Sequence, residues 1–208
     1  MTKSTPAGWW VLLAFAVAIA GYGFANVVRG PAMYPPNLLD SFAARPWGIY
    51  PHAFLGSCAL LLGPFQFRRD LLRNRPRHRL LGQAYLLACL GTGVAGLYMA
   101  VFSYGGMVTH LGFGGLALWL LGSILLAYQA IKGRDVARHR EWMIRSYALI
   151  YAAVTLRIEI PTLMAVTRGD FDFTYHVTSW LCWVPNLLVA EWYIRRSRPR
   201  AADLPVAA

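Results

Sequence analysis

Five histidines carry the clearest chemical potential in this sequence, and four of them form two matched pairs. His52 and His110 each lie at the start of one long apolar segment, and His78 and His139 each lie at the start of another. Two opposed imidazoles inside a helical bundle are a familiar way to hold a metal ion or a haem iron. The fifth, His176, has no such counterpart, and we interpret it as structural or as lying near a substrate.

The surroundings of the four histidines favour haem over a bare metal ion. Each pair lacks a neighbouring cysteine or carboxylate, whereas zinc and di-iron sites need three or more protein ligands. Three glycines, Gly56, Gly82 and Gly114, each follow a histidine by four residues, so they share its helix face and would leave room for a flat porphyrin. Arginines suited to haem propionates flank the second pair: Arg77, Arg79, Arg138 and Arg140. These patterns predict two b-type haems.

Arg157 is the one arginine expected deep inside an apolar segment. It follows His139 by 18 residues, which is five helical turns or about 27 Å. It therefore shares a helix face with His139 while lying near the depth of His52 and His110. We expect it to bind a propionate of an outer haem or an anionic electron donor.

The composition indicates the class of protein in which these residues are held. Of 208 residues, 57% are apolar and only 14% are charged, with a mean hydropathy of +0.43. Soluble domains have about 25% charged residues, and disordered chains have low hydrophobicity, so both classes are excluded. The net charge of +11 does not indicate nucleic-acid binding, because the arginines fall in short clusters between apolar runs. The remaining class is an integral membrane protein of one domain, residues 1–208, surrounded by the lipid bilayer.

Six apolar stretches are long enough to cross the hydrocarbon core as helices. They are continuous and about twice as long as the alternating segments of a membrane β-barrel. The predicted fold is therefore an all-α polytopic membrane protein with these spans: Trp9–Val28, Trp47–Phe67, Leu80–Phe102, Thr109–Ile131, Trp142–Val166 and Phe173–Ile194.

The basic residues predict the orientation, because short cytoplasmic loops are enriched in Lys and Arg. The second and fourth loops and the C-terminal tail are basic: Arg68, Arg69, Arg73, Arg75, Arg77, Arg79, Lys132, Arg134, Arg138, Arg140, Arg195, Arg196, Arg198 and Arg200. The other side has only Arg29, Arg45 and Arg168. We expect a bacterial inner-membrane protein with both termini cytoplasmic. The first span continues beyond the signal-peptidase-like Ala18-Ile19-Ala20, so we expect it to stay uncleaved.

The two histidine pairs coincide with an internal repeat of two spans. His110 follows His52 by 58 residues, and His139 follows His78 by 61 residues. Two equivalent units predict a four-helix core of spans two to five around a pseudo-two-fold axis along the membrane normal. We expect span two near span four and span three near span five, with spans one and six flanking the core.

Three motifs resemble a bacterial family of predicted membrane proteins of unknown function: Gly63-Pro64-Phe65-Gln66-Phe67, His78-Arg79-Leu80-Leu81-Gly82-Gln83-Ala84-Tyr85 and His139-Arg140-Glu141-Trp142-Met143. The architecture also resembles the cytochrome b561 class of transmembrane di-haem electron carriers. That resemblance implies that His52 and His110 ligate an outer haem, and that His78 and His139 ligate an inner one.

The leading hypothesis is transmembrane electron transfer by a b-type di-haem cytochrome, an oxidoreductase that acts on a quinol or another small redox partner. The first alternative is a small permease without cofactor, in which the histidines and Arg157 line a polar pathway. The second is a membrane assembly subunit whose small-residue faces bind another protein. An intramembrane hydrolase is disfavoured by the lack of a credible Ser/His/Asp set. The oligomeric state is left open, with a homodimer among the assemblies considered.

Overall fold

The apolar segments of the chain form helices, and the described part of the molecule contains no strand. The computed structural model describes residues 7–197. The predicted all-α polytopic class is therefore confirmed, while the predicted tail arginines Arg198 and Arg200 lie outside the described residues. The α-helices are α1 Ala7–Arg29, α2 Leu39–Ala43, α3 Pro46–Leu62, α4 Arg69–Arg73, α5 Arg75–Val101, α6 Met107–Lys132, α7 Val136–Ile150, α8 Ala152–Val166, α9 Phe171–Leu181 and α10 Val184–Ser197, and short 3-10 helices cover Gly30–Met33, Pro36–Leu38 and Pro64–Phe67.

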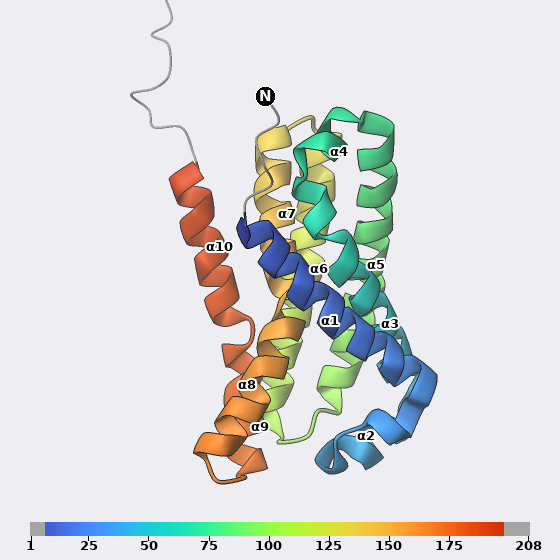
Figure 1. Ribbon diagram of the computed structural model, residues 1–208, viewed down its shortest axis with the longest axis vertical. Helices are drawn as coiled ribbons and strands as arrows, with labels where there is room; N and C mark the ends of the chain where they lie inside the picture. The colour runs from blue at the N-terminus through green and yellow to red at the C-terminus, as the bar shows by residue number, and fades with distance from the viewer. Residues whose placement is uncertain (1–6, 198–208) are drawn as a thin grey trace, which may run out of the picture.

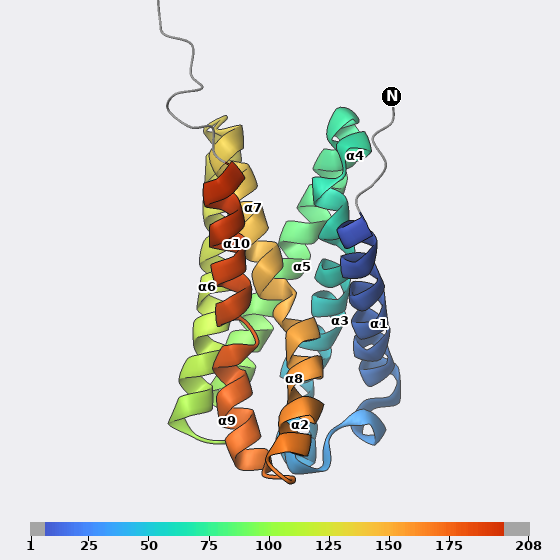
Figure 2. The same ribbon diagram turned by 60° about the vertical axis from the view of Figure 1, so that its left-hand side comes forward.

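Five helical segments within the described residues are long and apolar enough to cross a membrane: Ala7–Met33, Pro46–Phe67, Arg75–Val101, Met107–Lys132 and Val136–Val166. They correspond to the first five predicted spans. The sixth predicted span, Phe173–Ile194, is divided between α9 and α10, much as the fifth is divided between α7 and α8. Pro185, in the first turn of α10, has no N–H to continue the helix from α9. The two helices nevertheless follow one another along the bundle (Figures 1 and 2).

The histidine-bearing helices α5 and α7 begin with the same local device. The side chain of Asn74 accepts a hydrogen bond from the backbone N–H of Arg77 at 3.2 Å, and Asp135 accepts one from Arg138 at 2.9 Å. Such N-caps satisfy backbone donors that a helix start leaves free. His78 and His139 each follow their cap residue by four positions. The internal repeat therefore extends to the caps, and each histidine lies one turn inside its helix.

The core consists of two helix pairs, and its arrangement corrects one expectation. Helix α3 packs along α5, α6 packs along α7, and α5 packs along α6. The repeat-related helices α3 and α6, and likewise α5 and α7, lie diagonally, and among the described residues their backbones come close at few points at most. The prediction that repeat-related spans are neighbours is therefore wrong. A two-fold axis through the centre of a four-helix bundle relates diagonal helices, but it would also make α3 pack along α7 as α5 packs along α6. The contact between α3 and α7 is much smaller, so the described residues follow the predicted pseudo-symmetry only in part.

The remaining helices cover the two pairs unequally. Helix α1 crosses α3 obliquely, α8 contacts α1 and α9, and α10 lies along α7 (Figure 1). Direct contact between α3 and α7 is limited, and the α3/α5 and α6/α7 pairs diverge toward the end that carries α4 (Figure 2). We call this end, with the loops 68–79 and 132–140, the basic end, and the other the opposite end. The two histidine pairs lie near these two ends.

Candidate functional sites

The first candidate site lies near the basic end, and His78 on α5 is its central residue. The Nδ1 atom of His78 is buried and has no hydrogen-bond partner among the described residues. A buried polar atom without a partner costs roughly 1–3 kcal/mol, which a bound ligand would recover. His78 also lies close enough to His139 for the charges of the two rings to interact. The two rings of this predicted pair thus lie within electrostatic range of each other, on the diagonal helices α5 and α7.

His139 is held in one defined tautomer. Its Nδ1–H donates to the backbone carbonyl oxygen of Ala127 on α6 at 2.8 Å. A carbonyl oxygen only accepts, so in the neutral ring Nε2 carries a free lone pair. A backbone hydrogen bond of this kind is the usual way in which proteins orient a metal-ligating histidine.

Gln66 completes what we call the His78 cluster, which consists of Gln66, His78 and His139. Its side chain is 4% exposed, and its Oε1 atom is buried without a partner in the described part of the chain. A Cβ atom added at Gly82, one turn along α5 from His78, would lie 3.3 Å from this oxygen. The unpartnered Oε1 atom of Gln66, from the 3-10 helix Pro64–Phe67, therefore lies against α5 one turn away from the unpartnered Nδ1 atom of His78.

Below the His78 cluster, on the side away from the basic end, the helices pack tightly. Tyr85, which is fully buried, and Ser146 on α7 share a hydrogen bond of 3.0 Å. Gly63, at the end of α3, lies directly against the ring of Tyr147, so that no side chain fits there. These contacts join α3, α5 and α7 below the histidines. The three sequence motifs that resemble one family thus meet in a single region of the fold.

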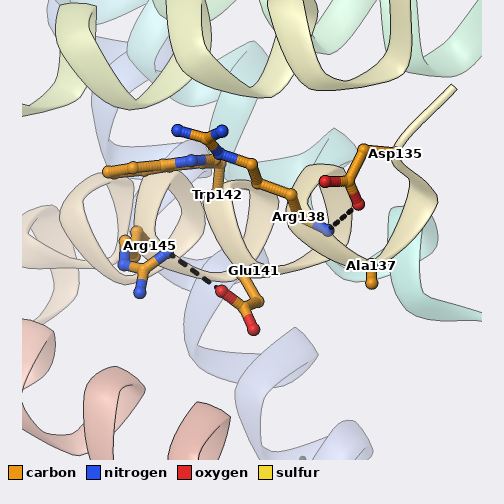
Figure 3. A pocket seen from close by; sticks show the side chains of 6 residues that line it. All are labelled: Asp135, Ala137, Arg138, Glu141, Trp142 and Arg145. Atoms are coloured by element: carbon orange, nitrogen blue, oxygen red, sulfur yellow. Dashed lines mark hydrogen bonds and ion pairs between the residues drawn. The ribbon is translucent and has the colours of Figure 1, made fainter. Parts of the chain in front are cut away.

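The arginines predicted to bind propionates lie on the outside of the basic end. All four are exposed: Arg77, Arg79, Arg138 and Arg140. Arg138 lines an open cavity of about 420 Å³ on α7 (Figure 3), and Arg79 lines one of about 410 Å³ on α5. The first cavity also contains Trp142, whose ring lies 4.4 Å from the guanidinium carbon of Arg145. Arg145 in turn pairs with Glu141 and Glu191, so its charge is already compensated.

The second candidate site lies toward the opposite end, around His52 on α3. Its Nδ1–H donates to the carbonyl oxygen of Thr92 at 3.2 Å, and the Thr92 hydroxyl donates to the carbonyl oxygen of His52 at 3.0 Å. A Cβ atom at Gly96 would lie 3.1 Å from the imidazole, so this glycine allows the ring to lie against α5. The Nε2 atom is left as the free lone pair, and the residue keeps accessible surface.

Arg157 on α8 lies close enough to His52 for their charges to interact. Its guanidinium carbon is 5.2 Å from the ring centroid of Tyr22 on α1, a cation–π contact, and its charge also interacts with Tyr175 on α9. No carboxylate within residues 7–197 forms an ion pair with it. We call His52, Arg157, Tyr22 and Tyr175 the His52 cluster. The depth predicted for Arg157 agrees with this position.

His110, the predicted partner of His52, is engaged differently. Its Nε2–H donates to the carbonyl oxygen of Ser103, in the loop before its own helix, at 2.9 Å. The nitrogen that usually ligates haem iron is therefore occupied. His176 likewise donates from Nε2 to the carbonyl oxygen of Gly105 at 2.6 Å, which supports its structural interpretation. Both histidines hold the loop between α5 and α6.

The three glycines predicted to border porphyrins face neighbouring helices instead. A Cβ atom at Gly56 would lie 3.1 Å from the Thr92 hydroxyl, and one at Gly114 would lie 3.9 Å from the Cβ atom of Ala100. Gly82 faces Gln66, as described above. Small residues at such positions let membrane helices approach closely. Their predicted role beside a porphyrin stays a prediction.

The side chains of the two sites include four that the sequence patterns did not single out: Tyr22, Gln66, Thr92 and Tyr175. Gln66 was visible only within a motif. Tyr22 and Tyr175 join the His52 cluster, and Thr92 bonds to His52, through contacts between distant helices. The described residues contain no group of three or more His, Cys, Asp or Glu side chains that could hold a metal ion.

Comparison with known proteins gives one match. The model of a family described as Predicted membrane protein (DUF2306) matches residues 49–194, which include α5, α6, α7, α8 and α9 and most of α3 and α10. No curated protein and no solved structure matches the chain. The comparisons thus support the resemblance to a membrane-protein family, and they do not support the resemblance to the cytochrome b561 class.

Proposed function

This chain belongs to the family described as Predicted membrane protein (DUF2306), and we propose that it carries electrons in the membrane on a b-type haem held by His78 and His139. The observation that carries the proposal is the free Nε2 atom of His139, whose ring lies within electrostatic range of the His78 ring. The two histidines lie on helices α5 and α7, which are diagonal to each other in the core.

The chain's own residues have definite tasks in this proposal. The bond from His139 to Ala127 fixes one ring and leaves its Nε2 atom free for the iron. His78 supplies the second imidazole, and the exposed Arg77, Arg79, Arg138 and Arg140 provide positive charge at the basic end. Bound haem would supply reversible one-electron chemistry. The packing of α3, α5 and α7 would keep water away from it.

The second haem predicted between His52 and His110 stays a prediction. The hydrogen bond of the His110 Nε2 atom to Ser103 does not support it, because that ring would have to turn before it could bind iron. We therefore place one haem in the proposal. The redox partner is a quinol or another small reductant, the protein resides in the bacterial inner membrane, and both termini are cytoplasmic.

One observation favours a second function. The accessible side chains of His52 and Arg157 lie within membrane-spanning helices, where ionisable residues also mark transport pathways. A permease without cofactor would use these residues to pass a polar solute. The absorption spectrum distinguishes the two functions.

The proposal is tested by expressing the full chain with ample haem and recording reduced-minus-oxidised spectra with haem quantitation. We expect about one haem per chain and a b-type spectrum. His78→Ala and His139→Ala should each lose it, because a single remaining imidazole holds haem iron weakly. His176→Gln is the matched control, since it changes a histidine outside both pairs and should retain the haem.

Circular dichroism and gel-filtration profiles of each variant show that it is folded. A folded parent protein that stays colourless would refute the proposal, and so would full haem retention in both His78→Ala and His139→Ala. If His52→Ala and His110→Ala each remove one further equivalent, the second haem is established.

A further inference from the structure

We propose that the His52 cluster binds the headgroup of a quinone or quinol that enters sideways from the lipid. This inference deepens the proposed function by naming the class of the redox partner and its place. The cluster combines four helices, with Tyr22 on α1, His52 on α3, Arg157 on α8 and Tyr175 on α9. The electron-transfer proposal concerns other residues, at the basic end.

The donors and acceptors of the cluster match this class of ligand. Arg157 offers guanidinium N–H donors to a quinone carbonyl oxygen or a phenolate oxygen. His52, whose Nδ1–H is used by Thr92, offers Nε2 as an acceptor for a quinol O–H. A ligand that carries both an acceptor oxygen and a hydroxyl group on one ring satisfies both residues. A simple anion would satisfy Arg157 alone.

Arg157 also needs a partner at its depth. It lies nine residues, or about 13 Å of helix, before the end of α8 at Val166, and His52 lies six residues, or about 9 Å, after the start of α3 at Pro46. Both positions are below the helix ends, where water is scarce and an uncompensated charge is costly. Within residues 7–197 the guanidinium has the Tyr22 ring as a neighbour but no carboxylate in an ion pair.

The surface next to the cluster is apolar, which indicates access from the bilayer. Three of the four helices that form the cluster carry exposed apolar side chains. These are Val17 on α1, Phe54 on α3 and Ile158 on α8, at 52%, 47% and 49% exposure. Such residues face lipid in a membrane protein, and His52 and Arg157 are themselves accessible. A ligand with an isoprenoid tail fits this combination better than a water-soluble solute.

The test uses the full chain in phosphatidylcholine nanodiscs, photolabelled with an azido-ubiquinone, and maps the labelled peptides by mass spectrometry. We expect labelling of peptides from α1, α3 and α8 that excess decyl-ubiquinone suppresses. Arg157→Gln should reduce labelling about tenfold, since it removes a charged donor. Arg157→Lys should lie between, because it keeps the charge without the forked donors. Arg168→Gln, at an exposed arginine of the same end, is the matched control and should label like the parent.

Labelling that is equal in the parent and in Arg157→Gln would overturn the inference. Suppression by phosphatidylglycerol or inorganic phosphate, but not by decyl-ubiquinone, would also overturn it and assign the site to an anionic headgroup. The measurement contains no haem signal. A colourless protein with Arg157-dependent labelling would therefore refute the electron-transfer proposal alone, and a haem protein without such labelling would refute the quinone site alone.

Discussion

At the scale of single residues, four of the histidines differ in which ring nitrogen, Nδ1 or Nε2, donates a hydrogen bond to the backbone. His52 and His139 donate from Nδ1 to a carbonyl oxygen of a neighbouring helix and keep Nε2 free. His110 and His176 donate from Nε2 to the loop between α5 and α6. Since all four residues are the same type, only their surroundings decide which ring is available as a ligand.

A buried hydroxyl pair allows a prediction at this scale. Tyr85 is fully buried. The Ser146 hydroxyl donates a hydrogen bond to the carbonyl oxygen of Met143 and can therefore accept one from the Tyr85 hydroxyl. Ser146→Ala should lower the free energy of unfolding by about 1 kcal/mol, because it leaves the buried Tyr85 hydroxyl with only the thiol of Cys89, a weak hydrogen-bond partner. The measurement is reversible unfolding in mixed micelles, followed by circular dichroism.

The double variant Tyr85→Phe/Ser146→Ala provides the control, because it removes both polar atoms. It should be more stable than Ser146→Ala alone if the weakly bonded hydroxyl causes the loss. Equal stability of the two variants would contradict this explanation.

At the scale of elements, close helix contacts depend on glycines placed at specific crossings. Gly63 ends α3 against the Tyr147 ring of α7, whereas Gly122 on α6 has open space where a Cβ atom would lie. The two glycines occur in similarly apolar sequence. Only the crossing partner makes the first one indispensable.

Gly63→Ala should therefore destabilise the protein by about 1–3 kcal/mol, because the added methyl group overlaps the Tyr147 ring. Gly122→Ala should be neutral or stabilising by up to about 1 kcal/mol, since alanine is the better helix former. Thermal unfolding in detergent compares the two. The double variant Gly63→Ala/Tyr147→Leu has a smaller side chain at position 147 and should recover part of the lost stability. If it recovers none, the clash with the Tyr147 ring is not the cause of the destabilisation.

At the scale of the whole molecule, the basic end collects the arginines of two loops, and the opposite end has few. In membrane proteins, the end with the more basic loops normally faces the cytoplasm. At the opposite end, the Tyr104 hydroxyl donates to Asp172 at 2.5 Å, and this carboxylate raises the pKa of Tyr104. The bond ties the loop after α5 to the first turn of α9.

The orientation gives a prediction for intact cells. In a background in which Cys58, Cys89 and Cys182 are replaced by alanine, Arg73→Cys and Lys132→Cys should resist a membrane-impermeant maleimide added to spheroplasts. Ala44→Cys, at the opposite end, should react. Permeabilised cells should label all three variants, and the reverse pattern in spheroplasts would contradict the proposed orientation.

The sequence by itself determined the all-helical membrane fold and most span boundaries. These depend on local properties: the length of an apolar run, and side chains such as Asn74 and Asp135 that cap a helix start a few residues away. The repeat of His-Arg motifs also predicted two equivalent helix pairs. Such signals need no knowledge of which helix lies beside which.

Tertiary structure decided the rest, because it depends on contacts between residues far apart in the chain. Only the packed bundle places repeat-related helices on diagonals and puts Gln66 beside Gly82. It also binds His110 to its own loop and brings Arg157 to Tyr22. Apolar helices satisfy their backbone hydrogen bonds internally, so their sequences leave many packings open. The crossing of particular side chains selects one of them, and with it the nitrogen atoms and charges that remain free to bind a ligand.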